Sequence, residues 1–343
     1  MRVKLDKVCK RIYAGGDVPK GRYSTVKTAE YAIPIYANAE KDNGLYGYTD
    51  TARENELSIT VAARGTIGFT AIRREPFLPV VRLITVVPDL STVSERYLYY
   101  ALRNCKPAFS GTSIPQLTVP DIKKNEIELY SLSVQETIAD KLDAVGRIIE
   151  LRQQQLQKLD DLVKARFVEM FGDCKSMVSM NELCSIITDG THQPPRFQES
   201  GIPFIFVSNL VGNVVTYNAE KFISEDTYAE LYKRTPIEIG DLLLSTVGSY
   251  GHPAVVTEDR KFLFQRHIAY LKPRHNMVNS FYLHSALLAP DGQRQIEEKV
   301  KGIAQKTLNL SEIKKIVVPL PTIEEQNQFE KFVNQTDKSK LSL

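Results

Sequence analysis

The hydrophobic and polar positions of the chain follow two different periods. In most of the sequence, short apolar runs lie between Tyr, Pro and Gly residues, and this pattern predicts short strands and turns. Residues 133–171, SVQETIADKLDAVGRIIELRQQQLQKLDDLVKARFVEMF, contain no proline and one glycine, and their apolar positions recur about every 3.5 residues. This spacing predicts one long helix of the coiled-coil type, which would span roughly 57 Å at 1.5 Å per residue.

The apolar seam of this helix is narrow. With positions 142 and 145 as a and d of a heptad, the seam consists of Ile138, Leu142, Val145, Ile149, Arg152, Leu156, Leu159, Val163, Arg166 and Met170. Ser133 and Glu136 have the spacing of a capping box, and Gly172 is a suitable residue after the last turn. A long core helix within one domain is the alternative. The polar residues outside the seam favour a spacer helix paired with a second helix.

The chain contains two copies of one unit. Residues 110–136 align with residues 301–327 without a gap, so that Gly111 meets Gly302 and Gln135 meets Gln326. Three further matches keep the same order, namely residues 3–16 with 178–191, 33–34 with 202–203, and 63–68 with 246–251. In each copy a hairpin-like pair of strands surrounds a Gly-rich turn, and a short helix follows at 94–104 or 279–289. Matches in a common order indicate the duplication of a whole fold.

The duplication predicts an α+β fold with two mixed α/β lobes separated by long coiled-coil-type helices. The expected parts are a first lobe at 1–130, a central spacer helix at 131–172, a second lobe at 173–321 and a shortened second helix at 322–343. Thr322 and Glu325 form a capping box for the second helix. The repeat places Gln326, Phe329, Val333 and Thr336 along its seam.

Composition narrows the class of protein. A chain of 343 residues with 43% hydrophobic residues can fill two domain cores. It has no run of 18 apolar residues and no signal-peptide pattern, so we expect a soluble, cytoplasmic protein without a membrane segment. Its cysteines, Cys9, Cys105, Cys174 and Cys184, lack CxxC spacing, which indicates buried thiols rather than zinc ligands or a disulfide framework. Residues 1–130 carry 19 basic and 14 acidic residues, a balance consistent with a polyanionic partner.

Together these features resemble the DNA-specificity (S) subunits of type I restriction–modification enzymes of bacteria and archaea. The resemblance covers nearly the whole chain and rests on the duplicated lobe–helix layout and on three motifs. These are LDDLVKARFVEMFGD at 159–173, ITDGTHQPP at 187–195 and PLPTIEEQ at 319–326. It implies that each lobe is a target-recognition domain reading one half of a split double-stranded DNA sequence, and that this chain performs no chemistry.

The resemblance also implies partners. The paired helices would separate the half-sites and dock methyltransferase (M) subunits, and restriction/translocase (R) subunits would join the complex. AdoMet, ATP and Mg²⁺ would belong to those subunits, and this chain would hold no cofactor or metal. The second helix would run antiparallel to the central helix and begin near residues 159–170. An expected partner-binding strip, which could also support self-association, consists of Leu142, Val145, Ile149, Leu156, Leu159 and Val163.

Candidate DNA contacts are polar, basic and aromatic residues on Gly- or Pro-rich loops, because such loops can reach base edges and phosphates. In the first lobe they are Lys20, Arg22, Tyr23, Tyr46, Tyr48, Arg64, Thr66, Arg73, Arg74, Ser113 and Gln116. In the second lobe they are Thr191, His192, Arg196, Ser208, Asn209, Ser249, Tyr250, Gln305, Lys306 and Thr307. The alternative for each is a solvated loop residue, and the tyrosine pair at 46 and 48 could instead belong to the lobe core.

Two other functions are weighed against this one. Pro290, Asp291, Glu297 and Lys299 have the outline of a PD…ExK nuclease site, but residues 291–303 read as helical and the first copy has no counterpart. The histidines, at 192, 252, 267, 275 and 284, all lie in the second copy, so the two copies cannot share histidine chemistry. No AdoMet-type glycine motif or NPPY-like motif is present. The other alternative is a helical adaptor with two protein-binding lobes.

Overall fold

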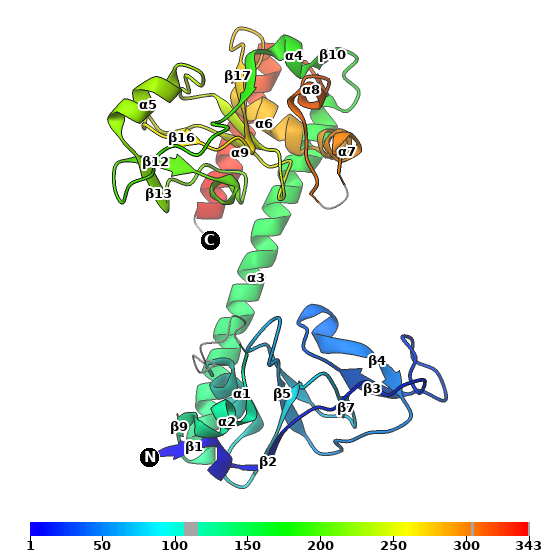
Figure 1. Cartoon of the computed structure of the whole chain (residues 1–343). Helices are drawn as coiled ribbons and strands as arrows, with labels where there is room; N and C mark the ends of the chain where they lie inside the picture. Colours follow the sequence, from blue (N-terminus) through cyan, green and yellow to red (C-terminus); the bar gives the residue numbers. More distant parts are fainter. Residues whose placement is uncertain (106–115, 303–304, 342–343) are drawn as a thin grey trace. The chain divides into compact units, whose positions relative to one another are not determined.

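The chain divides into two compact units, residues 1–151 and 152–343, each of which holds one copy of the fold (Figure 1). The computed structural model describes residues 1–105, 116–302 and 305–341. Helix α3 (Leu132–Phe171) contributes its first part to unit 1 and its remainder to unit 2. Within the described ranges, no helix combines the length and apolar character needed to cross a membrane.

Unit 1 contains a four-stranded sheet in the order β2-β8-β5-β6, a three-stranded sheet β4-β3-β7 and the pair β1-β9. Its strands are β1 (Arg2–Lys4), β2 (Cys9–Ala14), β3 (Ile33–Tyr36), β4 (Leu45–Thr49), β5 (Ser58–Val61), β6 (Thr70–Arg73), β7 (Leu78–Pro79), β8 (Ile84–Pro88) and β9 (Glu126–Glu128). Its helices before α3 are η1 (Leu5–Lys7), η2 (Lys41–Gly44), α1 (Glu95–Arg103) and α2 (Val119–Lys124).

Unit 2 repeats these sheets in the same order, as β11-β17-β14-β15, β13-β12-β16 and β10-β18. Its strands are β10 (Met177–Ser179), β11 (Cys184–Asp189), β12 (Ile202–Ile205), β13 (Lys221–Ile223), β14 (Leu242–Ser245), β15 (Pro253–Val255), β16 (Leu263–Phe264), β17 (Ile268–Pro273) and β18 (Val317–Pro319). Its helices are α4 (Met180–Leu183), η3 (Val207–Leu210), α5 (Glu225–Tyr232), α6 (Ser280–Leu288), α7 (Pro290–Lys299), α8 (Leu310–Ile313) and α9 (Ile323–Leu341). The duplication and the α+β class are therefore confirmed.

The predicted hairpins and short helices are also confirmed. Strands β5 and β6 pair antiparallel, as do β14 and β15. The turn after β5 contains Gly65 and Gly68 at φ 68° and 86°, a left-handed conformation that favours glycine. Helices α1 and α6 begin after Ser94 and Asn279, whose side chains accept hydrogen bonds from the first helical turn.

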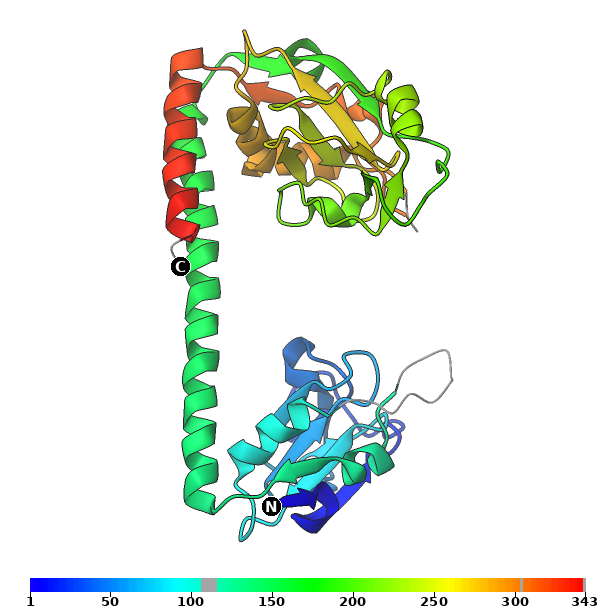
Figure 2. The same cartoon turned by 90° about the vertical axis from the view of Figure 1, so that its left-hand side faces the viewer.

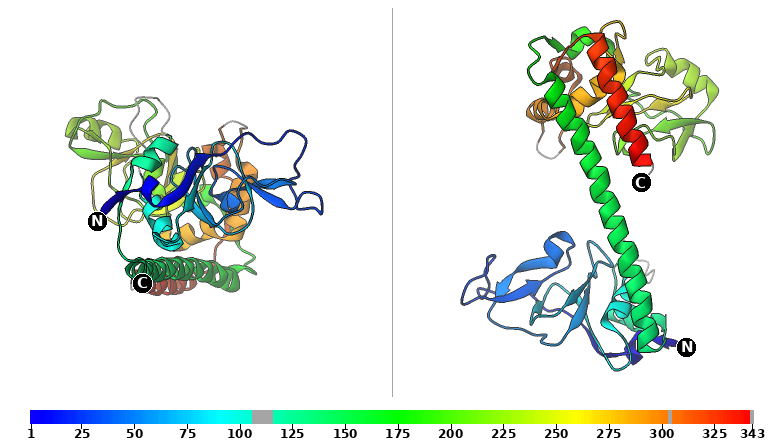
Figure 3. Two further views of the ribbon diagram at one scale, coloured as in Figure 1. Left: turned by 90° about the horizontal axis from the view of Figure 1, so that it is seen from below. Right: turned by 180° about the vertical axis from the view of Figure 1, so that it is seen from behind.

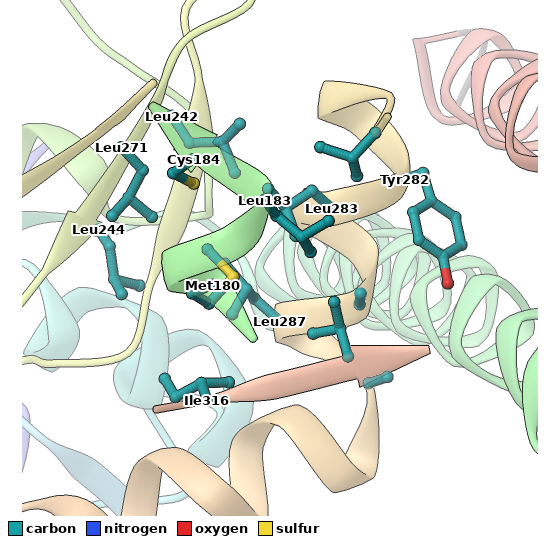
Figure 4. Close-up of a cluster of buried hydrophobic side chains, with 14 of the residues drawn as sticks. Met180, Leu183, Cys184, Leu242, Leu244, Leu271, Tyr282, Leu283, Leu287 and Ile316 are labelled. Atoms are coloured by element: carbon teal, nitrogen blue, oxygen red, sulfur yellow. The ribbon is translucent and has the colours of Figure 1, made fainter. Parts of the chain in front are cut away.

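Each unit buries its own apolar core. In unit 1, Ile59 and Val86 of the four-stranded sheet pack with Leu98 of α1 and Ile122 of α2. In unit 2, side chains from α4, α6 and the sheet gather in one cluster, which includes Leu183, Leu242, Leu271 and Leu283 (Figure 4). The end of α3 and the start of α9 complete this second core.

Helix α9 runs antiparallel to the C-terminal part of α3 (Figures 2 and 3). The Phe167 and Phe171 rings lie 5.5 and 5.6 Å from the Phe329 ring, and Lys340 near the other end of α9 binds Asp160 at 2.7 Å. The predicted direction and starting place of the second helix are therefore confirmed. Its predicted seam is buried, and that seam consists of Gln326, Phe329, Val333 and Thr336.

Two details of the helix prediction are wrong. Helix α3 begins one residue earlier than Ser133, and Glu136 does not cap it, because its carboxylate binds Arg96 of α1 at 2.6 Å. Near its C-terminus, α3 buries Phe167 and Phe171 outside the predicted seam. The buried face is wider there because α9 and the lobe both pack against it.

Candidate nucleic-acid interface

Four segments of unit 1 that are distant in sequence meet beyond the end of β5. The Arg64 guanidinium donates two hydrogen bonds to Oε1 of Gln116, at 2.9 and 3.1 Å. Next to this pair, the backbone N–H of Leu117 donates to the carbonyl of Ala63 at 2.9 Å. Asn38, on the third segment, links Ala63 to the fourth, because its Oδ1 accepts from the Ala63 N–H at 2.8 Å and its Nδ2 donates to the Val81 carbonyl. We name this group, with Arg82, the unit 1 corner.

The turn that carries Arg82 into the corner is strained. Val81 and Arg82 lie between β7 and β8 at φ 51° and 62°, where residues other than glycine are uncommon and a β-branched residue is an outlier. Both side chains are exposed. Our sequence reasoning missed Arg82, because the segment LPVVRLIT reads as one continuous strand without a Gly or Asn turn signal.

Unit 2 has a corner of the same construction. The backbone N–H of Leu308 donates to the Thr246 carbonyl at 2.8 Å, just as Leu117 does to Ala63 in unit 1. Arg266 and His267 occupy the turn between β16 and β17 and line a cavity of about 250 Å³. The unit 2 corner consists of five residues that line this cavity together with other polar and apolar side chains, namely Asp189, Arg266, His267, Gln305 and Thr307.

Arg266, His267 and Gln305 at the unit 2 corner suit a polar, negatively charged ligand, and the Asp189 carboxylate beside them is paired with Arg234. Burial and the charge of Arg266 both lower the pKa of His267, so its imidazole is neutral at pH 7 and can accept as well as donate a hydrogen bond. Arg266 supplies a permanent cation, and Gln305 supplies a side-chain amide. Sequence reasoning predicted Gln305 and Thr307 but missed Arg266 and His267, which share the position of Val81 and Arg82 in unit 1.

Three other predicted contacts of unit 1, Arg22, Tyr23 and Tyr46, lie on the β3–β4 side of the lobe. The Tyr23 and Tyr46 rings lie 5.9 Å apart, and both are exposed. Arg22 binds Asp50 at 2.5 Å, and Arg74 binds Glu95 of α1. These two arginines are therefore already neutralised by carboxylates, and they would have to exchange those partners to bind a phosphate.

Two of the predicted contacts of unit 2, Lys306 and His192, also lie against carboxylates. Lys306 donates to Glu297 of α7 at 2.9 Å and to the Tyr250 hydroxyl at 3.2 Å, and Tyr250 donates to the same carboxylate. We name Tyr250, Glu297 and Lys306 the unit 2 clamp. His192 lies 2.8 Å from Asp189, which also binds Arg234 at 2.5 Å. Thr191, His192 and Arg196 line a second cavity of about 440 Å³.

Two predicted contacts are corrected by the structure. Arg73 is 3% exposed, with its guanidinium 3.6 Å above the Tyr36 ring and hydrogen-bonded to the Asn43 carbonyl at 2.7 Å. Asn209 is 8% exposed and binds the backbone of its own loop. Both side chains satisfy internal groups and cannot reach a ligand. Ser113 lies outside the described residues. The remaining contacts, which include Lys20, Tyr48, Thr66, Ser208 and Ser249, stay predictions.

The nuclease outline does not form a site. Asp291 and Glu297 both lie on α7, as expected for a helical segment. The Asp291 carboxylate binds Arg294 and Gln295, whereas Glu297 belongs to the clamp. Within residues 1–105, 116–302 and 305–341, no group of three His, Cys, Asp or Glu side chains could hold a metal ion.

The predicted partner strip of α3 is largely uncovered. The exposed fractions of Leu142, Val145, Ile149 and Leu156 are 39%, 53%, 53% and 38%. Val163, further along, packs against the core of unit 2. The absence of a covering helix from this chain over Val145, Ile149 and Leu156 is therefore confirmed for the described residues.

In each unit, a lobe with a polar corner is followed by a helix. Residues 1–161 and 176–343 match the type I restriction modification DNA specificity domain, and the chain belongs to that family. A putative type I specificity subunit of Mycoplasma pneumoniae is 35% identical over 165 residues, 45% of this chain and 45% of that protein. The EcoBI specificity subunit of Escherichia coli is 25% identical over 356 residues, 93% of this chain and 71% of that protein.

Solved structures share the fold. The S subunit of a type I restriction–modification system from M. genitalium is 16% identical, with a TM-score of 0.51, and the match covers 100% of this chain and 90% of that one. A chain from a structural study of complex assembly in the type I system is 16% identical, with a TM-score of 0.53 and coverage of 100% and 91%. The matched region is less than half of the M. pneumoniae relative, at 45% of its length.

Proposed function

We propose that this chain is the DNA-recognition subunit of a type I restriction–modification complex, in which each unit reads one half of a bipartite duplex target. The observation that carries this proposal is that both units form a corner at the same place in the fold, although the arginine and the glutamine occupy different positions in the two copies. Each corner presents an arginine and a glutamine from loops that meet beyond the end of a strand. Arg pairs with guanine and Gln with adenine through two hydrogen bonds each, so both corners carry the side chains of direct base readout.

The helices supply the second half of the proposal. The exposed aliphatic strip at Leu142, Val145 and Ile149 docks a methyltransferase subunit, because an uncovered apolar face on a helix is stabilised when a partner buries it. The same strip is also suited to self-association of the isolated chain. Methylation and cleavage, with the AdoMet, ATP and Mg²⁺ that they need, belong to the M and R subunits. In this assignment the chain itself is not catalytic.

Methylation mapping tests the proposal. The chain is expressed with its methyltransferase partner in a host without other methylation, and modified sites are read by single-molecule sequencing. We expect one motif with two specified parts and an unspecified spacer of fixed length. Exchanging residues 1–130 for a foreign lobe should change one part only. A single contiguous motif would refute two-part reading.

A helical adaptor with two protein-binding lobes is the competing function. The two functions differ in their response to salt, because contacts to phosphates release counterions and make log Kd depend steeply on log salt concentration. Duplex binding by the full chain, measured from about 50 to 200 mM salt, should therefore weaken steeply. Binding that is absent at all salt concentrations would favour the adaptor.

A further inference from the structure

A buried glutamine joins each lobe to the helix that follows it. Gln135 lies in the first turn of α3 and Gln326 in the first turn of α9, and both side chains are 0% exposed. The Oε1 atom of Gln135 accepts a hydrogen bond from the backbone N–H of Ser94 at 2.8 Å. The Oε1 atom of Gln326 accepts the equivalent bond from Asn279, also at 2.8 Å. Ser94 and Asn279 are the N-caps of α1 and α6.

Both glutamines also donate two hydrogen bonds from Nε2. The acceptors are the carbonyl oxygens of Thr92 (3.0 Å) and Tyr130 (2.9 Å) in unit 1, and of Met277 (3.2 Å) and Pro321 (3.0 Å) in unit 2. Each amide therefore satisfies one backbone N–H and two backbone carbonyls at a junction. Buried groups of this kind are costly to leave without a partner, so the side chain cannot move away while the junction stays packed.

The rest of the two junctions is different. In unit 1, Arg96 of α1 binds three carboxylates of α3, those of Glu136, Asp140 and Asp143, at 2.5–2.6 Å. In unit 2 the position of Arg96 is occupied by Phe281. There the contacts between α6 and α9 are made by the rings of Tyr282 and Phe329 and by Asn279, whose Nδ2 donates to Glu330 at 2.7 Å. The glutamine contacts are retained although these surroundings have changed. This argues that they serve a purpose common to both lobes.

We propose that Gln135 and Gln326 are positioning residues that fix the angle of each lobe on its helix, and with it the number of unread base pairs between the half-sites. The inference rests on the proposed function. Three hydrogen bonds to one planar amide hold the loop before α1 or α6 in both position and direction relative to the helix. One base pair of spacing corresponds to about 3.4 Å of translation and roughly 35° of rotation along the duplex, so a lobe that turns on its helix meets a different register.

Variants of unit 2 test the proposal, because the half-site of unit 1 then serves as an internal reference. In Gln326→Leu all three hydrogen bonds are lost, whereas Gln326→Asn keeps the amide but shortens its reach by one methylene. Gln328→Leu, two residues further along α9 and exposed, is the matched control. Each chain is mapped with its methyltransferase partner and is also followed by hydrogen exchange.

We expect the wild type and Gln328→Leu to modify sites of one spacer length. Both Gln326 variants should modify the same two half-sites at additional spacer lengths, with sites one base pair longer or shorter rising about tenfold. Exchange of the Asn279 amide should accelerate by about tenfold, the effect of losing one buried hydrogen bond. If Gln326→Leu does not fold, the spacer lengths and the Asn279 exchange rate of Gln326→Asn test the proposal.

One unchanged spacer length together with accelerated exchange at Asn279 overturns the proposal, because the junction would then be loosened without effect on register. Unchanged exchange overturns it as well, since Gln326 would then not hold the junction. Failure of the proposed function is distinguishable from both results, because the wild type itself would then show no two-part motif. The exchange measurement would still report in that case on whether Gln326 holds the junction.

Discussion

Neutralising Glu297 should change how the chain responds to salt when it binds DNA. In the unit 2 clamp, Glu297 accepts hydrogen bonds from Tyr250 and Lys306, and these contacts hold the pKa of its carboxyl below the ordinary value. The carboxylate is therefore ionised at neutral pH and competes with a phosphate for Lys306. The variant Glu297→Gln removes this competitor and keeps the size of the side chain.

The size of the effect follows from counting ions. In the wild type, Lys306 must leave a carboxylate before it binds a phosphate, and the freed carboxylate attracts cations, which offsets part of the release from the phosphate. In Glu297→Gln no carboxylate is freed, so the contact gives a net release of about 0.9 cation on duplex DNA. The slope of log affinity against log salt should therefore become steeper by up to about 0.9, and the gain in affinity should be largest at low salt.

Fluorescence anisotropy with the full chain and a labelled duplex measures this slope. Glu298→Gln is the matched control, because Glu298 is the next residue on α7 and pairs with Arg294 rather than with Lys306. It removes the same charge without releasing the clamp, so its slope should stay near that of the wild type. Equal slopes for the wild type and Glu297→Gln would refute the reasoning, as would the same increase in both variants.

Three further outcomes are expected. Arg82→Ala should relax one position of the unit 1 half-site, at a cost of about 1–3 kcal/mol in discrimination, and methylation mapping should show the other half-site unchanged. The double variant Val145→Lys/Ile149→Lys should abolish methyltransferase binding or self-association in sedimentation, whereas unaffected binding would show that the strip is not the interface. Burial lowers the pKa of His284 in the folded state, so the unfolded state binds this proton first and stability should fall as pH drops below about 6.5. Urea unfolding should show this loss, at up to about 1.4 kcal/mol per pH unit, and His284→Gln should reduce it.

Most of the fold could be predicted from the spacing of apolar residues and from the internal repeat of the sequence. The match between 110–136 and 301–327 predicted that both copies share one layout, and the strand orders of the two units are indeed the same. The seam of α9 could be derived from that offset because helix packing follows spacing in the sequence. The wider buried face of α3 at Phe167 could not, since it depends on the lobe that packs there as well as on α9.

The site was harder to predict because polar residues in loops look alike in a sequence. Arg73 stands beside the exposed Arg74, yet it closes β6 with its side chain directed at the Tyr36 ring. In the sequence, Asn209 resembles an amide that could read a base, but in the structure it hydrogen-bonds to the backbone of its own loop. Arg82 was missed for the opposite reason, because a strained turn without glycine resembles a strand. Only the folded structure shows which polar side chains bond to groups of the protein itself and which are available to bind a ligand.

The duplicated junction has a consequence for how such a chain can change. Residues 110–136 and 301–327 align without a gap and cover the end of each lobe and the first turns of its helix, including the buried glutamine. A genetic crossover within this stretch, between the two copies or with another gene of the same layout, would keep the reading frame and the junction contacts. The product would carry a different lobe on an intact helix. Under the proposed function, new half-site specificities would therefore arise by exchange of whole lobes, without a series of substitutions that each preserve the fold.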